Sequence, residues 1–372
     1  MVKKVRHVMG ISGGKDSAAL AIYMKDNYPE LDIEYYTADT GKELKETYQL
    51  INNLEVYLGK KILRLRAYDD SPENPFDHKL KSLSGFLPNP QHRWCTKSLK
   101  LDVFEEFVGN DPVVSYVGIR GDESRDGYIS SKGTIQSIFP FRQNIWSQEI
   151  NKFVLDNNKI GLTLQLADQL IPVEKLERFK ELLSFKTFDE LFTMEQKLLQ
   201  LLNLSTSGYN ALVHEMLKTS RYPLAKENHF PLINNEEVLL LDDIFDLLEK
   251  SGVGIPAYYK DIEFEVDGQK ATYNRSRSGC YFCFFQQKIE WIWLYEQHPD
   301  MFAKAMEYER DDFMWNMEES LAQLIQPERV KAIKLDYIKR KTRIEKSKKS
   351  NKLRDILADD AEVDLACASC FI

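Results

Sequence analysis

The sequence has no long hydrophobic run and few cysteines. Its 372 residues include five cysteines, an odd number. No apolar stretch approaches the roughly 20 residues that cross a bilayer, and the run before Gly10 is too short for a secretory signal. We therefore expect a cytoplasmic protein without membrane contact, whose cysteines serve a metal or redox role rather than a disulfide framework.

The sequence also lacks an excess of positive charge. The net charge is −8, so the surface as a whole does not attract nucleic acid. Residues 331–354 are the local exception, with eleven lysines or arginines against two acids, Asp336 and Glu345. This segment predicts either contact with a nucleic-acid phosphate backbone or a solvated, partly disordered linker.

Strand-like and helix-like stretches alternate over the first 120 or so residues. The expected strands are residues 5–12, 31–41, 60–68 and 113–124, and the helices between the first three are 16–28 and 43–58. This alternation predicts a parallel sheet with crossover helices. Ligands of such sheets gather at the carboxyl ends of the strands.

The rest of the chain divides by composition. Leucine, lysine and glutamate recur at helical spacing from residue 146 to 228, which predicts a helical insertion. A helix beginning at Lys288 carries Trp291, Trp293 and Tyr295, which we expect in the core rather than stacked on bases. The expected units are a nucleotide-binding domain over 1–145, the insertion over 146–228, a Cys-x-x-Cys segment completing the catalytic domain over 229–330, and a basic segment with a cysteine-containing tail over 331–372.

The stretch GISGGKDSAAL follows the first expected strand and opens the first expected helix. Backbone N–H groups converge at such a helix start, the helix dipole favours anions, and glycines allow phosphate oxygens to approach. The predicted phosphate contacts come from Ser12, Gly13, Gly14, Lys15, Asp16 and Ser17. The Walker spacing is not met, because only three residues separate Gly10 from the Gly14-Lys15 pair and an acid replaces the Mg²⁺-binding hydroxyl.

The run S-G-G-K-D-S resembles the pyrophosphate loop of the PP-loop ATP pyrophosphatases, which share the adenine nucleotide alpha hydrolase-like fold. The resemblance implies cleavage of ATP between its α- and β-phosphates, adenylation of a substrate oxygen and release of pyrophosphate. It implies Mg²⁺ as the counter-ion of the phosphates. The fold class expected is thus a doubly wound α/β sheet, with a helical insertion and a cysteine-bearing C-terminal segment.

Three further motifs resemble the phosphoadenosine phosphosulfate reductase branch of that superfamily. They are DTGKELKET at residues 39–47, HRWCTKSLK at 92–100 and GIRGDESRDG at 118–127. The motif set is most similar to the sulfurtransferase branch that acts in DNA phosphorothioation, and more remotely to tRNA-thiolating enzymes.

The side chains of these motifs have readable physical roles. Asp39 and Thr40, with Gly41, suit ribose hydroxyl or adenine amine contacts, although plain turn residues are the alternative. Arg120 and Arg125 suit a bidentate clamp on phosphate or sulfate, and we assign them, with Lys15 and Asp16, to catalysis.

The acids and bases beside these residues leave alternatives open. Asp122 and Glu123 either hold Mg²⁺ or pair with the arginines. Arg93, Lys97 and Lys100 form a basic wall around Cys95 or belong to an exposed charged helix. We assign the three basic residues and Glu123 to substrate binding.

The pair Cys280 and Cys283 has the Cys-x-x-Cys spacing of a metal or cluster corner. By resemblance to sulfur-inserting relatives, we expect these two residues and Cys95 to bind a [4Fe–4S] cluster. One iron would then lack a protein thiolate and could carry sulfide or a substrate atom. Zinc and purely structural cysteines are the alternatives.

The tail carries a second Cys-x-x-Cys, Cys367 and Cys370, either of which could complete the cluster or relay sulfur. The E-C-G-x-H context of the assimilatory reductases is absent around Cys367, which weighs against sulfonucleotide reduction. The functional expectation is an ATP pyrophosphatase that adenylates a substrate, nucleic acid first, for sulfur insertion. A sulfur donor such as a cysteine desulfurase and a multiprotein complex are expected partners. The alternatives are a thiol-dependent phosphoadenosine phosphosulfate reductase and a non-catalytic nucleotide-binding accessory module.

Overall fold

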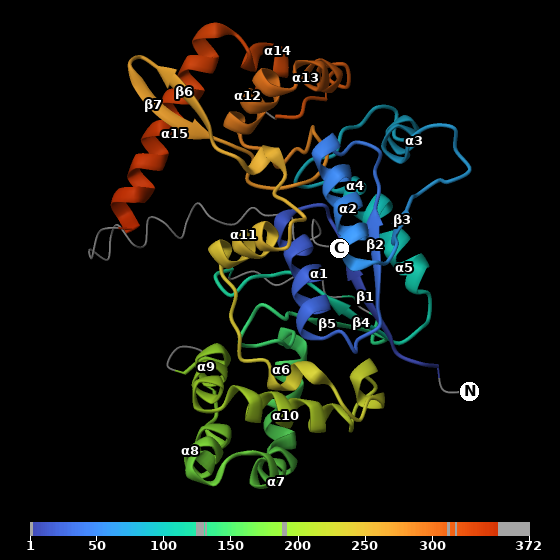
Figure 1. The fold of residues 1–372 in the computed structure, drawn as a ribbon, viewed down its shortest axis with the longest axis vertical. Helices are drawn as coiled ribbons and strands as arrows, with labels where there is room; N and C mark the ends of the chain where they lie inside the picture. Colours follow the sequence, from blue (N-terminus) through green and yellow to red (C-terminus); the bar gives the residue numbers. More distant parts are fainter. Residues whose placement is uncertain are drawn as a thin grey trace.

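A parallel five-stranded sheet forms the centre of the molecule, in the order β3-β2-β1-β4-β5 (Figure 1). The computed structural model describes residues 3–123, 130, 132–187, 192–310, 313–316 and 318–348, with side chains as far as residue 344. The strands are β1 (Arg6–Gly10), β2 (Ile33–Ala38), β3 (Ile62–Leu65), β4 (Val113–Tyr116) and β5 (Ile135–Ile138). This sheet and the helices on both its faces confirm the predicted doubly wound α/β fold.

Neighbouring residues of β1 point to opposite faces of the sheet, and each face has its own core. Met9 packs in the core that includes α1 (Lys15–Asn27) and α2 (Lys45–Leu58). Val8 packs with Phe104 of α5 (Asp102–Val108) on the other face. The strands are therefore buried on both sides, as parallel sheets require.

The strand order reverses direction beside β1. The chain moves outward from β1 to β2 and β3, then crosses back to place β4 on the other side of β1. The loops that follow β1 and β4 consequently diverge at the carboxyl edge of the sheet, where a crevice for a ligand forms in this class of fold. Both loops carry motifs found in the sequence.

The fifth strand, β5, was not predicted. Its sequence IQSI places polar Gln136 and Ser137 in buried positions, so it lacks an apolar strand pattern. The Gln136 side chain is used structurally, because its Oε1 accepts the Leu224 N–H at 3.1 Å. Pairing with β4 and this contact, both tertiary, hold the strand in place.

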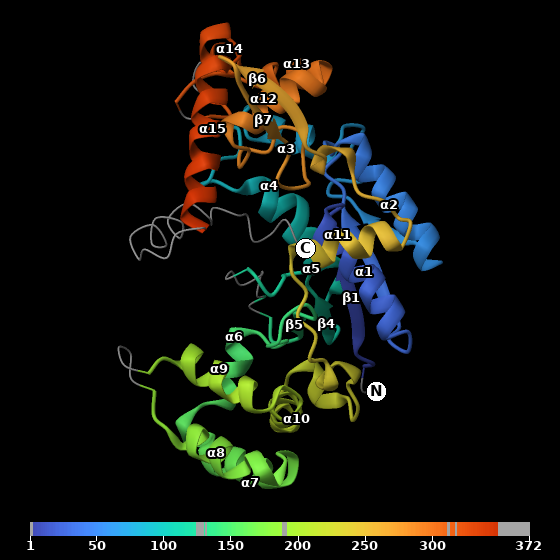
Figure 2. The same ribbon diagram turned by 60° about the vertical axis from the view of Figure 1, so that its left-hand side comes forward.

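Helices fill the described part of residues 146–228, in agreement with the periodicity of the sequence. They pack at the end of the sheet opposite the C-terminal elements in both views (Figures 1 and 2). The elements that follow β5, as far as α11, are α6 (Gln148–Val154), η2 (Asn157–Lys159), α7 (Ile160–Leu170), α8 (Val173–Ser184), α9 (Met194–Leu204), α10 (Thr206–Leu217), η3 (Pro223–Lys226), η4 (Pro231–Asn234) and α11 (Leu241–Lys250). Helix α11 returns the chain to the side of α1. The division into four units stays a prediction.

The C-terminal elements build a second core above the carboxyl edge of the sheet. They are η5 (Ala257–Tyr259), the antiparallel hairpin β6 (Ile262–Val266) and β7 (Gln269–Tyr273), α12 (Lys288–Gln297), α13 (Pro299–Met306), α14 (Leu321–Leu324) and α15 (Pro327–Lys348). This core also takes in α3 (Pro75–Ser82) from the first half of the chain. Trp291 and Trp293 are buried within it, as expected, whereas Tyr295 is 38% exposed, so the expectation was wrong for that residue.

The basic segment is helical over much of its length. Residues 331–348 belong to α15, which packs on α12 and β6 through buried Ile333, and residues 349–354 lie outside the described part. The linker alternative is therefore wrong for the described stretch, because tertiary packing holds the helix despite its charge. Among the helices described, none is both long enough and apolar enough to cross a membrane.

Candidate active site

The glycine-rich loop connects β1 to α1 and presents free backbone donors. The amide groups of Gly13, Asp16 and Ser17 donate no hydrogen bond to any described residue. The loop is held from inside, since Ser17 Oγ accepts the Ser12 N–H at 3.1 Å and lies 3.1 Å from Ser12 Oγ. Free amides at the start of α1, together with the helix dipole, are the features on which the sequence prediction of an anion site depends.

Both glycines of the loop are required by close contacts. Gly13 has φ 73°, and a Cβ there would lie 2.3 Å from Thr47 Cγ2. A Cβ on Gly14 would lie 2.6 Å from Ser278 Oγ, which belongs to the segment before the Cys-x-x-Cys. The loop is therefore enclosed by α2 and by a segment from much later in the chain.

Lys15, Asp16 and Arg120 form a buried ion-pair network. Lys15 Nζ lies 3.0 Å from one oxygen of Asp16, and Arg120 Nη1 lies 2.6 Å from the other. Burial by itself lowers the pKa of Arg120, but Asp16, Glu123 and Asp122 together outweigh burial and raise it. The loop after β1 is thus joined to the loop after β4, and two cations lie beside the free amides.

The loop after β4 is held by paired charges. Arg120 Nε lies 2.8 Å from Asp122 Oδ1, and Glu123 accepts the Arg120 N–H at 3.1 Å. Arg142, which the sequence analysis missed, donates to the carbonyl oxygens of Arg120 and Glu123. In this structure the two acids pair with arginine, the second of the two predicted possibilities. Arg125 lies outside the described residues.

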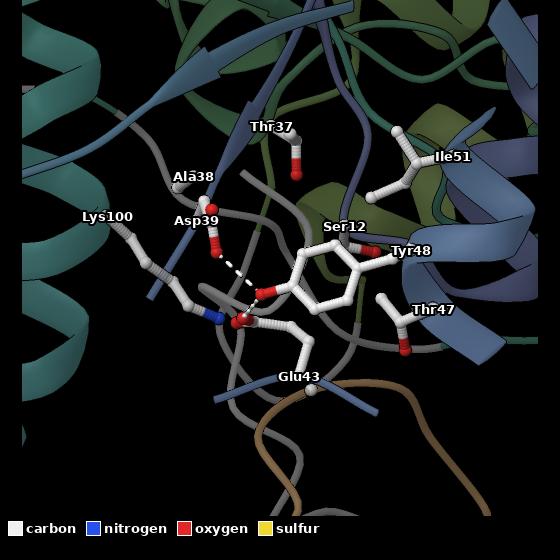
Figure 3. A pocket seen from close by; sticks show the side chains of 10 residues that line it. Ser12, Thr37, Ala38, Asp39, Glu43, Thr47, Tyr48, Ile51 and Lys100 are labelled. Carbon is white, nitrogen blue, oxygen red and sulfur yellow. Dashed lines mark hydrogen bonds between the residues drawn. The ribbon is translucent and has the colours of Figure 1, made fainter. Parts of the chain in front are cut away.

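A pocket at the end of β2 gathers acids around a tyrosine (Figure 3). Tyr48 OH donates to Asp39 Oδ1 at 2.8 Å and to Glu43 Oε2 at 3.0 Å. Burial raises the pKa of Glu43, and Asp39 adds to the rise, whereas Thr40 and Lys100 oppose it. Ser12 lines the same pocket. It belongs to the glycine-rich loop of residues 12–17, which we call the phosphate loop. Asp39 is therefore placed where the sequence predicted a nucleoside contact, and Glu43 is an acid that sequence reasoning missed.

Thr40 and Gly41 shape the turn that follows β2. Gly41 has φ 77° and donates its N–H to Asp39 Oδ1 at 2.9 Å. Thr40 is buried, and its hydroxyl donates to Glu43 Oε1 at 2.7 Å while lying 3.2 Å from Cys280 Sγ. Thr40 thus links the carboxyl edge of the sheet to the cysteines.

The predicted basic wall divides into one residue that reaches the site and two that do not. The helix that starts with α4 (Trp94–Thr96) widens into a π-helical turn, η1 (Lys97–Leu101), before α5. This wider turn brings Lys100 to the side of the helix that carries Cys95. Lys100 lines both the pocket around Asp39, which we call the Asp39 pocket, and the pocket that contains Cys95. Lys97 is exposed and pairs with Asp102 at 2.9 Å. Arg93 is exposed, with its guanidinium 4.9 Å from the centre of the Phe285 ring.

The three predicted cysteine ligands line one pocket, which we call the thiol pocket. Cys95 comes from α4, and Cys280 and Cys283 come from the loop before α12. The other lining residues are mostly aromatic or small, namely Thr40, Phe76, Pro88, Thr96, Lys100, Gly279, Phe282, Phe284, Phe285 and Trp315. The fold thus brings together thiols separated by more than 180 residues of sequence.

Backbone pairing places Cys280 in this pocket. Cys280 forms an isolated antiparallel bridge with Glu43, and the Tyr281 N–H donates to the Lys42 carbonyl at 2.9 Å. Burial raises the pKa of the Cys280 thiol, and Glu43 raises it further. A bound cation would reverse this preference, because a coordinating thiol is deprotonated.

The donor set is three thiols in one pocket, which is the chemistry of a cluster or a zinc site. Within the described residues, no three His, Cys, Asp or Glu side chains are close enough to hold one metal ion. The [4Fe–4S] cluster therefore stays a prediction for these three thiols. Cys367 and Cys370 lie outside the described residues.

Two tyrosines of η5 close the phosphate loop from the C-terminal side. Tyr258 OH donates to the Gly13 carbonyl at 2.9 Å, and Tyr259 OH accepts the Lys15 N–H at 3.3 Å. The nearby Arg275 is fully buried and donates to the Cys280 carbonyl at 3.2 Å. Its Nε and Nη1 have no partner among the described residues. Sequence reasoning missed these residues, because no short motif marks a contact across this separation.

Comparison with known proteins assigns the first part of the chain. The sequence profile of the phosphoadenosine phosphosulfate reductase domain matches residues 6–138, so this domain is present. An uncharacterized protein of Methanocaldococcus jannaschii is 36% identical over 121 residues, which are 32% of this chain and 23% of that protein. The chain thus aligns with less than a quarter of that relative's length. No solved structure matches the chain significantly.

Proposed function

We propose that the protein is an ATP pyrophosphatase that adenylates an oxygen atom of an acceptor, so that sulfur can replace that oxygen. The supporting observation is that the Asp39 pocket and the thiol pocket share two lining residues, Lys100 and Gly279. A nucleotide seated at the sheet edge therefore lies next to three thiols. The phosphoadenosine phosphosulfate reductase domain over residues 6–138 is consistent with this chemistry.

The phosphate loop supplies the electrostatics of the first step. An acceptor oxygen attacks the α-phosphorus of ATP, the bond to the bridging oxygen of the β-phosphate breaks, and pyrophosphate leaves with the bond electrons. The free amides of residues 13, 16 and 17 and the ammonium of Lys15 face the charge that develops on the leaving group. Mg²⁺ would arrive with the phosphates, as this ion usually does, since the described acids form no three-ligand site.

Arg120 changes its partners when phosphate enters. Asp16 holds the guanidinium beside the loop at 2.6 Å, and Asp122 and Glu123 hold it from the other side. A phosphate oxygen would compete with these carboxylates for the remaining N–H donors. Arg120 and Lys15 would thereby position the triphosphate with the α-phosphorus toward the thiol pocket.

The second step needs a sulfur nucleophile beside the adenylated acceptor. A hydrosulfide equivalent forms a bond to the acceptor atom, the bond from that atom to the adenylate oxygen breaks, and AMP leaves, with no net oxidation or reduction. A [4Fe–4S] cluster held by Cys95, Cys280 and Cys283 would supply the binding site for that sulfur. The protein contributes the aromatic walls, which exclude water. A separate donor such as a cysteine desulfurase would deliver the sulfur.

The acceptor favoured by this site is nucleic acid. Helix α15 carries a high density of lysine and arginine, whereas the chain as a whole is acidic. Such a local cationic surface binds phosphate backbones. The DNA-modifying sulfurtransferases and the tRNA-thiolating enzymes are the two activities closest to this combination.

The test uses anaerobically purified full-length protein. We expect pyrophosphate and AMP from ATP, stimulated by DNA or tRNA, together with iron and acid-labile sulfide in the preparation. Substituting Cys280→Ala should lower the iron content and leave ATP binding intact. ADP and orthophosphate as the only products would refute the pyrophosphatase assignment. Unchanged iron in the variant would refute the ligand assignment.

Reduction of phosphoadenosine phosphosulfate is the second candidate, favoured by the domain match over residues 6–138. That reaction requires a thiol to attack the sulfur of the sulfonucleotide and a thiol-dependent partner to complete the reduction to sulfite. Release of sulfite from the sulfonucleotide in the presence of a reducing thioredoxin, without pyrophosphate release from ATP, would establish it instead.

A further inference from the structure

A groove of about 710 Å³ lies beside the thiol pocket and shares two of its walls. Phe284 and Trp315 line both spaces. The remaining walls come mainly from the loop before α12, from α12 and from α15, with Pro90, Asn316 and Glu318 from other loops. We call this space the α12–α15 groove. Nothing in the two steps described above uses it.

We propose that the α12–α15 groove binds one unstacked nucleotide of the acceptor strand and places it beside the thiol pocket. This inference rests on the proposed function and specifies the form of its substrate. The acceptor is then a nucleic acid with an extruded or single-stranded nucleotide, and an intact duplex does not enter the groove.

The size of the groove suits this ligand. Sites for small molecules commonly measure about 300–1,000 Å³, and the α12–α15 groove falls within that range. It is open on one side, so a nucleotide can enter while its strand continues along the surface.

The aromatic wall offers a face for stacking. Phe284 is half-buried, and its ring lies against Phe285 with the centroids 4.4 Å apart. The guanidinium of Arg93 lies 4.9 Å from the centre of the Phe285 ring, whose plane is tilted by 38° from that of Phe284. Trp291 and Trp315 are buried and support the wall. Stacking on an exposed ring is a common way to hold an unpaired base.

The groove also has a polar group without a partner. Gln286 is 8% exposed, and its Nε2 donates to the Tyr281 carbonyl at 2.7 Å. Its Oε1 has no hydrogen-bond partner among the described residues. A buried acceptor without a donor is unfavourable. Because this oxygen is itself buried, the amide must turn toward the groove before an N–H of a nucleobase edge can satisfy it.

One cation of the groove can reach a phosphate. Arg340 of α15 touches Asp336 through Nε at 3.1 Å, which leaves its terminal nitrogens for another acceptor. Arg329 is committed to Glu319 through two short contacts. Arg340 lies toward the basic end of α15. A base on Phe284 and its phosphate on Arg340 would together hold one nucleotide.

A peptide segment fits the groove less well. Extended peptides bind chiefly by adding a strand to a free sheet edge. The α12–α15 groove is lined by helices and by a loop, and neither β6 nor β7 contributes to it. An unpaired strand edge is therefore missing from the part of the groove that the structure describes.

The test measures binding of a fluorescently labelled single-stranded DNA by anisotropy, over a range of salt concentrations, with full-length anaerobic protein. We expect Phe284→Leu to weaken binding at least tenfold without changing the salt dependence. Arg340→Gln should reduce the slope of log K against log salt by about one, because it removes one phosphate contact. Phe185→Leu is the matched control, since this exposed ring lies at the end of α8, far from the groove.

A strand with abasic sites separates stacking from backbone contact. The abasic strand should bind the wild type and the Phe284→Leu variant equally. Equal affinity of both proteins for the normal strand, an equal loss on both strands, or no binding by the wild type would overturn the proposal. Unchanged ATP affinity of each variant shows that the fold is intact. Strand binding without pyrophosphate release would contradict the proposed function and leave the groove assignment standing.

Discussion

The hydroxyl of Tyr258 donates a 2.9 Å hydrogen bond to the carbonyl oxygen of Gly13, across 245 residues of sequence. Gly13 belongs to the phosphate loop, and Tyr258 belongs to the short helix that precedes the β6–β7 hairpin. The loop is therefore shaped partly by the C-terminal half of the chain. The conformation of this loop therefore depends on residues outside 1–145.

Replacing Tyr258 by phenylalanine removes this hydrogen bond and keeps the ring. A neutral hydrogen bond contributes about 1 kcal/mol, so we expect the KM for ATP to rise roughly fivefold while kcat changes little. Steady-state pyrophosphate release measures both constants. Tyr295→Phe is the control, because that ring is 38% exposed on α12. An unchanged KM would mean that the loop keeps its shape without the contact.

Lys15→Ala removes a cation from the phosphate loop and leaves Asp16 paired only with Arg120. Loss of one group that stabilises developing charge costs about 10²–10³ in rate. We expect pyrophosphate release to fall at least a hundredfold, in single-turnover measurements at saturating ATP. Lys60→Ala, an exposed lysine paired with Asp32, should behave like the wild type. A loss below tenfold would show that Lys15 does not touch the leaving group.

Gly14→Ala should block the loop by collision with a distant residue. The added Cβ would lie 2.6 Å from Ser278 Oγ and 3.2 Å from Tyr259 OH. We expect weaker ATP binding in isothermal titration. The double variant Gly14→Ala with Ser278→Gly should recover part of the affinity, because the nearest atom is gone. If the double variant binds no better than the single one, collision with Ser278 is not the cause of the loss.

Acid should remove a stabilising contact beside the α12–α15 groove. Hydrogen bonds from Arg329, then from Lys288, lower the pKa of Glu319 from 4.5 to about 2. Because the folded-state pKa is lowered, the stabilisation is complete above about pH 5 and is lost as the pH falls toward 2. The pair is partly exposed, so we expect Glu319→Gln to cost about 1 kcal/mol at pH 7. Urea unfolding at pH 7 and pH 3 should show this difference shrinking, and a constant difference would contradict it.

The sequence was informative where short motifs coincide with strand ends. The loop at residues 12–17 and the residues Asp39 and Thr40 lie at the carboxyl ends of predicted strands, and parallel strands place such residues at one edge. The fold class followed from the same alternation. Strand β5 was not predicted, because its middle residues are polar. One of them, Gln136, accepts a tertiary hydrogen bond from the Leu224 N–H.

The site residues that were not predicted from the sequence depend on tertiary contacts, which local sequence patterns do not encode. Glu43 lies in a recognised motif, but its importance comes from the bridge to Cys280. Tyr258 and Arg275 belong to no motif and reach the site only through the second core. Lys97 shows the reverse case, in which a promising charge pattern ends in an exposed ion pair with Asp102.

The bridge between Glu43 and Cys280 has a consequence for how the protein can be made and divided. The thiol pocket is absent from any fragment that ends before the Cys-x-x-Cys, however well its sheet folds. A ribosome must extend the chain by about 240 residues beyond Thr40 before the two halves of the site can meet. During that interval Cys95 has neither of its predicted co-ligands, so a cluster held by these three residues would be loaded late.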